Sequence, residues 1–181
     1  DGFAMMPNFS FGNAMTTFTG QNMGAKRMDR VDEGTKHGVA MAVGVSTAIT
    51  ILLLLFGHHL MMVFTDTPEL VDFSVRMLRI LAFGYIAVAI TQTLSGVMRG
   101  AGDTLTPMWI SLIVTVGLRV PIAYGLAYAT RSAQYATGRP ESVFISLLIS
   151  WTIGSLINLA FYRRGAWRKK DITQSTSREV A

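Results

Sequence analysis

The chain has 181 residues, of which half are hydrophobic and only 15% are charged, and its formal net charge at pH 7 is +5. An average soluble domain carries roughly 25% charged residues. This composition, with its long charge-free runs, excludes a disordered chain, a soluble globular domain and a collagen-like or coiled-coil rod. The absence of cysteine from the sequence excludes a disulfide scaffold, a cysteine-ligated zinc site and thiol catalysis.

The first apolar segment, residues 2–19, is interrupted by Pro7 and Asn8. It lacks the basic start and the small-residue cleavage site of a signal peptide, so we interpret it as the end of an earlier membrane span. Since the chain begins at Asp1 and not at a methionine, we expect it to be the C-terminal piece of a longer protein.

Four further segments are each long and apolar enough to cross a bilayer as a helix, which takes about 20 mostly apolar residues. These predicted spans cover residues 38–64, 73–98, 107–129 and 143–162. The sequence therefore predicts an all-α, polytopic membrane helix bundle with about four full transmembrane helices and the end of a preceding one.

The segments between the predicted spans alternate in charge. Residues 20–37 and the tail 165–181 are rich in Lys and Arg, and Arg99 follows the second span, whereas residues 65–72 hold acids and no base. The positive-inside rule places the 20–37 loop, Arg99 and the C-terminus in the cytoplasm of a multi-pass plasma (inner) membrane protein. The pI is 9.9, but bases divided among short loops form no contiguous basic face for nucleic acid. We expect the basic cluster 163–170 to contact anionic membrane lipids.

Small residues recur every four positions in two of the predicted spans. The stripes are Ala40, Gly44 and Ala48 in span 38–64 and Ser146, Ser150, Gly154 and Asn158 in span 143–162. Because membrane helices associate through the close approach of small residues, we interpret both stripes as packing faces. The polar Asn158 leaves open that the second stripe lines an internal cavity.

Pro121 lies inside the span 107–129. A proline in the middle of a helix removes one backbone hydrogen bond and bends the helix, and membrane helices tolerate this. The sequence therefore predicts a kink at Pro121, and it leaves open whether the kink moves as a hinge.

One face of the span 73–98 carries polar residues. Tyr85, Gln92 and Arg99 follow one another at a spacing of seven, and Ser95 lies between the last two. These positions share one face of a helix. The face is either a buried hydrogen-bonding stripe that only packs, or the lining of a polar cavity that meets a solute.

Arg119 lies near the middle of the span 107–129. An arginine at the centre of a membrane helix costs roughly 2.5–3.5 kcal/mol on insertion scales, so it needs a partner, water or a lipid headgroup. We expect Arg119 to face the bundle interior, and the stripe of Tyr85, Gln92 and Ser95 is a candidate for its surroundings.

Acidic residues and metal ligands are sparse at membrane depth. No Asp or Glu lies inside any predicted span, and Asp103 is the nearest. His58 and His59 are adjacent, so on a helix they point about 100° apart and cannot easily share one ion. We therefore predict no metal site, no cofactor and, without clustered catalytic groups, no enzyme activity.

A Gly-rich segment, Arg99 to Thr104, joins the second and third predicted spans. Gly100 and Gly102 permit a tight turn, and Asp103 or Thr104 can cap the helix that follows. The segment has neither the Lys-Ser/Thr pair nor the GxGxxG spacing of a phosphate loop, so we interpret it as structural.

The order of segments resembles the C-terminal lobe of a multidrug and toxic compound extrusion (MATE) transporter over residues 1–164. The resemblance rests on GQNMGA from Gly20, VFTDTPEL from Val63, VMRGAGDTLTP from Val97 and RVPIAY from Arg119. Members of that family have twelve helices in two six-helix lobes. The resemblance implies that this chain supplies the end of helix eight and helices nine to twelve.

The resemblance also implies export of organic cations and other amphipathic drugs by antiport against sodium ions or protons, together with an N-terminal lobe absent from this chain. Some members have an acidic residue in the tenth helix, but residues 73–98 have none. We therefore expect the coupling ion to bind outside this chain. The candidates for lining a substrate cavity are Tyr85, Gln92, Ser95, Arg119 and Asn158.

Two other classes of function stay open. A related flippase for a lipid-linked oligosaccharide would favour several cavity arginines, and the predicted spans offer one at mid-depth, Arg119. The other class comprises membrane enzymes and structural, non-transport membrane subunits. A transport panel distinguishes an exporter from a flippase, and an enzyme would need catalytic groups clustered at one depth.

Overall fold

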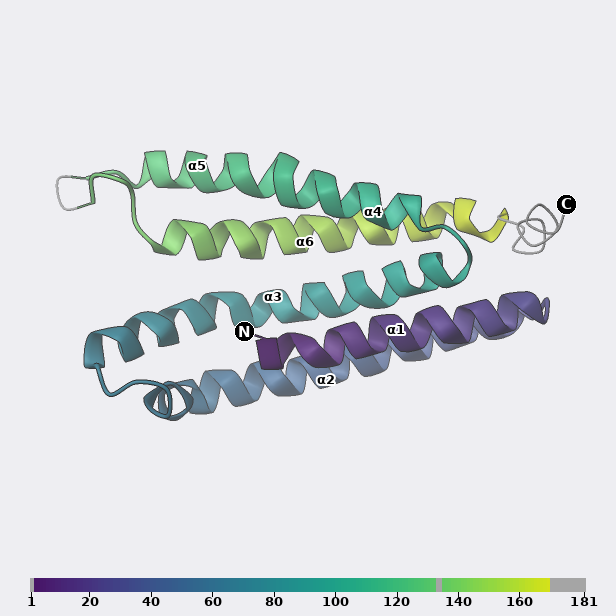
Figure 1. Ribbon diagram of the computed structural model, residues 1–181, viewed down its shortest axis with the longest axis horizontal. Helices are drawn as coiled ribbons and strands as arrows, with labels where there is room; N and C mark the ends of the chain where they lie inside the picture. The colour runs from purple at the N-terminus through teal and green to yellow at the C-terminus, as the bar shows by residue number, and fades with distance from the viewer. Residues whose placement is uncertain (1, 133–134, 170–181) are drawn as a thin grey trace, which may run out of the picture.

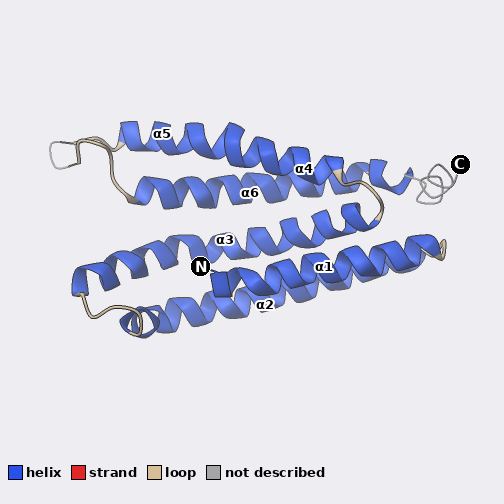
Figure 2. Ribbon diagram, viewed as in Figure 1, coloured by secondary structure: helices blue, strands red, loops and turns tan. Residues whose placement is uncertain are grey.

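The computed structural model describes residues 2–132 and 135–169, and these residues form long helical rods that lie side by side (Figure 1). Figure 2 shows helices joined by short connections throughout the described part of the chain. The elements are α1 (Gly2–Gly24), α2 (Met28–Met62), α3 (Pro68–Gly100), α4 (Leu105–Leu112), a π-helical segment (Ile113–Leu118), α5 (Arg119–Ala129), α6 (Glu141–Arg164) and a 3₁₀ turn (Ala166–Lys169).

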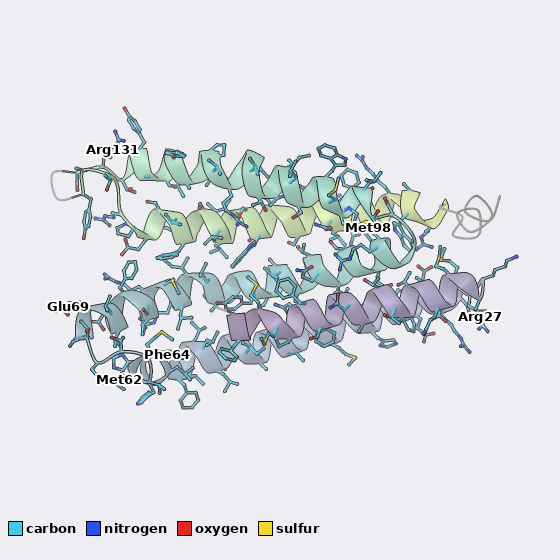
Figure 3. The ribbon with its side chains drawn as sticks, viewed as in Figure 1. Arg27, Met62, Phe64, Glu69, Met98 and Arg131 are labelled. Atoms are coloured by element: carbon cyan, nitrogen blue, oxygen red, sulfur yellow. The ribbon has the colours of Figure 1, made fainter. Side chains whose placement is uncertain are left out.

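Within the described residues, four helical segments are long and apolar enough to cross a membrane: α2, α3, Leu105–Ala129 and α6. The predicted all-α membrane bundle is thereby confirmed. Consecutive helices run in opposite directions, so Arg27 and Met98 lie near one end of the bundle and Glu69 and Arg131 near the other (Figure 3). We call these the Arg27 end and the Glu69 end.

The helix α3 is the centre of the bundle. It packs against α1 and α2 on one side and against α6 on the other, and Figure 1 shows it between these two groups. Its N-terminal Pro68 needs no hydrogen-bond partner at the start of a helix, which lets α3 begin five residues before the predicted span.

The prediction that Pro7 and Asn8 interrupt the first segment is wrong, because α1 continues through both to Gly24. Pro7 removes one backbone hydrogen bond, to the carbonyl of Phe3, and the helix continues past it. Asn8 is fully buried. Its Nδ2 donates to the carbonyl oxygen of Tyr85 at 3.4 Å, and its Oδ1 accepts from Ser46 Oγ at 2.7 Å. Asn8 therefore joins α1 to both α2 and α3.

The predicted basic loop 20–37 is also wrong in extent. Only residues 25–27 connect the two helices, and the charged residues that follow belong to α2. With 35 residues, α2 is about 52 Å long and exceeds the roughly 30 Å hydrocarbon core of a bilayer. Its charged start projects beyond the apolar region, while Val31 and Thr35 remain buried in the bundle.

The two predicted packing stripes have different outcomes. Ser146, Ser150, Gly154 and Asn158 are all buried, as predicted. Ala40, Gly44 and Ala48 are exposed, and α2 instead buries a neighbouring face that includes Gly38, Ala42 and Ser46. Both faces of α2 repeat small residues every four positions, so spacing alone does not select the packed one.

Glycines bring α3 directly onto the backbone of α1. A Cβ added at Gly96 would collide with the carbonyl oxygen of Gly12, and one added at Gly100 would collide with the carbonyl oxygen of Thr16. Gly100 is the last residue of α3 and is needed for this contact. The turn itself uses Gly102, whose φ is +83°.

The predicted kink at Pro121 is preceded by a π-helical segment. The N–H of Arg119 bonds to the carbonyl of Val114, five residues earlier, where an α-helix would use the fourth. Pro121 lacks an N–H and its ring crowds the carbonyl of Gly117. The π-helical turn therefore lies next to a position where the α-helical hydrogen bond is already lost. The irregularity therefore spans residues 113–121 and is not confined to the proline.

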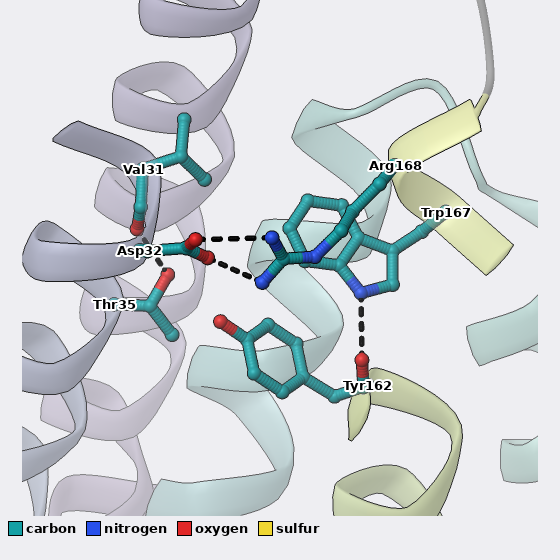
Figure 4. Close-up of polar contacts among 6 residues, drawn as sticks. All are labelled: Val31, Asp32, Thr35, Tyr162, Trp167 and Arg168. Atoms are coloured by element: carbon teal, nitrogen blue, oxygen red, sulfur yellow. Dashed lines mark hydrogen bonds and ion pairs between the residues drawn. The ribbon is translucent and has the colours of Figure 1, made fainter. Parts of the chain in front are cut away.

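The start of the predicted basic tail folds back on the bundle (Figure 4). Gly165, at φ +70°, ends α6, and the buried Trp167 stacks on Tyr162 and donates its Nε1–H to the Tyr162 carbonyl at 2.9 Å. Arg168 forms an ion pair with Asp32 of α2, with Nη1 3.0 Å from Oδ2. We call residues 165–169 the strap; it ties α6 to α2, and residues 170–181 lie outside the described part.

Candidate functional site

A cavity of about 460 Å³ lies between α3, α6 and the α4–α5 rod and reaches Met5 and Phe9 of α1. It is open to the surface of this chain, where the lining residues Thr104, Ser111 and Thr115 are exposed. Apolar side chains such as Trp151 and Val114 form part of its wall. The polar lining residues are Thr91, Gln92, Ser95, Arg99, Thr104, Ser111, Thr115, Arg119, Ser150 and Asn158. Such a mixed lining suits an amphipathic small molecule.

Arg119 lies at the cavity, as expected for an arginine that faces the bundle interior. Its Nε donates to Ser150 Oγ at 3.2 Å, and the Ser150 hydroxyl donates to the carbonyl of Leu147 at 2.9 Å. The side-chain partner of Arg119 is therefore on α6, one of the small residues of the packing stripe. Gln92 and Ser95 line the same cavity.

Ser95 and Asn158 close part of the cavity wall between α3 and α6. Ser95 Oγ donates to Asn158 Oδ1 at 2.9 Å, and Asn158 Nδ2 donates to the carbonyl of Gly154 at 2.9 Å. Asn158 thus both packs and lines the cavity, and the two interpretations left open by the sequence hold together.

Tyr85 lies outside the cavity although it belongs to the same stripe as Gln92. It is completely buried, clusters with Leu81 and Ala82, and its ring centroid is 6.2 Å from that of Trp151. Side chains from α1, α2 and α6 fill the bundle at this level. Along α3, the cavity therefore ends between Tyr85 and Val88.

Arg99 also belongs to the site, although it was not among the predicted cavity-lining candidates. The sequence placed it on the same polar face as Gln92. In the structure it is half-buried, lines the cavity and has its guanidinium against Gly12. What distinguishes it is the seven-residue spacing from Gln92.

Of the two residues predicted to cap the helix after the turn, Asp103 makes a hydrogen bond to the start of α4. Asp103 is buried, and its Oδ1 accepts from the N–H of Thr106 at 3.3 Å, which caps the start of α4. Asp103 is not among the residues that line the cavity.

The cavity lining is positively charged. It includes two arginines, and none of the described residues that line it is Asp or Glu. Within the described part of the chain, no group of three or more His, Cys, Asp or Glu side chains is placed to hold a metal ion. The chemistry that the site offers is therefore hydrogen bonding and positive charge beside an apolar wall.

Comparison with known proteins identifies the family. The MatE family model matches residues 1–125. The chain belongs to the MatE family. This agrees with the resemblance seen in the sequence, and a transporter family accords with the expectation that the chain is not an enzyme.

Relatives match almost the whole chain. It is 28% identical to a probable multidrug resistance protein, YoeA, of Bacillus subtilis over 95% of this chain and 36% of that protein. It is 28% identical to the multidrug resistance protein PmpM of Pseudomonas aeruginosa over 98% of this chain and 37% of that protein. The chain thus spans little more than a third of the length of these relatives.

A solved structure shares the fold. It is described as the inward-facing conformation of a multidrug resistance MATE family transporter, and it matches with a TM-score of 0.78 at 16% identity. The match covers 93% of this chain and 38% of that one. This MatE chain is therefore a multi-pass membrane protein whose helices are arranged as in part of a MATE transporter.

Proposed function

We propose that this MatE chain is the C-terminal lobe of a secondary transporter that exports amphipathic small molecules, including drugs, from the cell. The observation that carries the proposal is the cavity of about 460 Å³, with polar side chains on three helical rods and an apolar wall. The names of the relatives, which are multidrug resistance proteins, support the class of substrate.

Alternating access in such transporters requires one helix bundle to move against another. In this lobe, the tight contact of α1 with α3 and the strap between α6 and α2 favour movement as a unit. The π-helical segment borders the cavity through Val114 and Thr115. Together with Pro121 further along the rod, it is where local bending is easiest. By the positive-inside rule, the Arg27 end faces the cytoplasm.

The coupling ion, sodium or proton, is proposed to bind in the other lobe. Acidic residues of the described helices all lie in the first two turns of α2, α3 or α6, near the ends of the bundle. An ion site at membrane depth usually includes an embedded carboxylate. The cavity lining, with arginines and without Asp or Glu among the described residues, does not offer one.

The test uses the full-length protein that contains this chain, expressed in an efflux-deficient bacterial host. Loaded with ethidium, the cells should lose the dye faster than cells with empty vector, and collapse of the sodium or the proton gradient should abolish the difference. Equal dye loss with and without the protein, under both gradients and across a drug panel, would contradict the proposal.

The same panel includes a fluorescent lipid-linked sugar analogue in reconstituted vesicles. Movement of this analogue between leaflets, without efflux of any small drug, would replace the exporter with the flippase alternative. This chain alone, reconstituted in liposomes, should insert without coupled efflux.

A further inference from the structure

We propose that Arg119 forms a binding site for an oxyanion, the carboxylate of an amphipathic solute, at the inner end of the cavity. The inference rests on the proposed function, because it names a substrate class for the same cavity. Among the organic cations and other amphipathic drugs that the family resemblance implies, it singles out solutes that carry a carboxylate.

The first support is the charge environment of Arg119. The ion pairs in the described part of the chain involve Arg27, Arg76, Arg168 and His37, all near the ends of helices, and none involves Arg119. Its side-chain hydrogen bond goes to a neutral hydroxyl, that of Ser150. A charge at membrane depth is costly without a counter-charge, so a bound anion would stabilise it.

The second support is the geometry of the guanidinium. Nε is the atom held by Ser150, and Ser150 is itself fixed to the carbonyl of Leu147. A guanidinium carries five N–H donors in a planar fork. The Nη1 and Nη2 groups therefore remain for a ligand, and this pair matches the two oxygens of a carboxylate.

The third support is the composition of the surrounding wall. Trp151, Val114 and Met5 give the cavity an apolar surface, and Gln92 and Thr115 add neutral hydrogen-bonding groups. Since none of the described lining residues is acidic, a solute cation gains no counter-charge here. An aromatic body with one carboxylate fits these contacts better than an aromatic cation does.

The fourth support is Arg99 at the outer part of the same cavity. Arg119 follows Leu105 by 14 residues, which is about 21 Å of helix, whereas Arg99 lies beside the α3–α4 turn. An anion that enters from the Arg27 end thus meets one arginine on the way and the other at membrane depth. Like charges at both positions favour the entry of anions over cations.

The test measures binding of two fluorescent probes of similar size, 1-pyrenebutyrate and 1-pyrenebutanol, to the full-length protein purified in a neutral detergent. The protein should bind the carboxylate at least about tenfold more tightly than the alcohol at pH 7.5. Arg119→Gln should remove this preference and leave the binding of the alcohol unchanged. Arg119→Lys should keep part of the preference, because it retains the charge but loses the fork.

The matched control is Arg76→Gln, which removes an exposed arginine that pairs with Glu141 away from the cavity. It should leave the binding of both probes unchanged. Equal affinity of the unmodified protein for the two probes would overturn the proposal whether or not any variant folds. A preference that survives Arg119→Gln would overturn it as well.

A lipid phosphate could supply the same chemistry, so the binding measurement is repeated with added phosphatidylglycerol or with a neutral lipid. If phosphatidylglycerol does not displace 1-pyrenebutyrate, the result supports a solute carboxylate as the ligand of Arg119. Displacement by phosphatidylglycerol at concentrations similar to that of the probe would overturn the assignment to a solute. Ethidium efflux by the same protein separates the two proposals. Efflux without carboxylate preference contradicts only the Arg119 site, and preference without any efflux contradicts only the transport function.

Discussion

The two sides of α3 illustrate different ways to pack a membrane helix. Towards α1, Gly96 and Gly100 allow backbone to meet backbone, with no room for another side chain. Towards α6 and the α4–α5 rod, Gln92 and Ser95 border a cavity, and Ser95 hydrogen-bonds to Asn158 of α6. Apolar burial drives association only weakly in lipid. The α1 side of α3 is therefore held by close glycine contacts together with the hydrogen bonds of Asn8, whereas the other side leaves polar groups at a cavity.

The glycine side should be the more sensitive of the two. Gly96→Val places a side chain against the carbonyl of Gly12, and the cost should exceed the ~1–3 kcal/mol of ordinary overpacking because backbone must move. Size-exclusion chromatography after detergent extraction should show loss of most folded protein.

The control for this prediction is Gly125→Val in α5, where none of the described residues has a heavy atom within 4 Å of an added Cβ. Its folded yield should match that of the parent. Similar yields from Gly96→Val and Gly125→Val would mean that α1 and α3 do not touch as described.

The strap connects α6 to α2 at the Arg27 end, and its Trp167 is buried and stacks on Tyr162. Trp167→Ala should lower the free energy of unfolding by about 3 kcal/mol, the lower end of the range for a buried tryptophan. Trp167→Phe keeps the stack on Tyr162 and loses the hydrogen bond, which costs about 1 kcal/mol. Thermal melts in detergent measure both, and equal melts for the parent and Trp167→Ala would show that the strap is not docked.

On the cavity side, the bond between Ser95 and Asn158 should contribute modestly. A double-mutant cycle with Ser95→Ala and Asn158→Ala should give a coupling energy of about 0.6 kcal/mol, the average for side-chain hydrogen bonds between membrane helices. Thermal stability of the four proteins measures it. A coupling energy of zero would mean that the two side chains bind separately, to water or solute.

The smallest effect should come from the ion pair of the strap. Arg168 and Asp32 have side chains 39% and 37% exposed, so Arg168→Gln should cost no more than about 1 kcal/mol, and less at high salt. The exposed Arg163 provides the control, as Arg163→Gln. If Arg168→Gln lowered the free energy of unfolding as much as Trp167→Ala, the strap would be held mainly by its ion pair and not by the burial of Trp167.

Hydropathy predicted the four spans because the length and composition of a helix in lipid are set by the bilayer. The position of Arg119 near the middle of a span predicted that it faces the bundle interior, because exposing an arginine to lipid costs free energy. These features depend on one helix at a time, and a single sequence carries them.

Features that depend on helix rotation were not predictable in the same way. The small-residue stripe of Ala40, Gly44 and Ala48 has the same period as the face that α2 actually buries. An asparagine beside a proline favours a break in a helix. In the structure, however, the Asn8 amide is buried between three helices and hydrogen-bonds to Tyr85 and Ser46. The partner of Arg119 depends on how α5 and α6 face each other, which periodicity within either helix does not fix.

In the proposed mechanism, the cavity beside Arg119 is where this lobe binds the transported solute. The most direct test compares Arg119→Leu with Arg76→Leu in the full-length protein, as drug resistance of an efflux-deficient host at matched protein levels. Arg119→Leu should lose most of the resistance, and Arg76→Leu should keep it, because its partner Glu141 lies at the exposed Glu69 end. Parental resistance from both variants would contradict the account, since it would show that Arg119 has no role in transport.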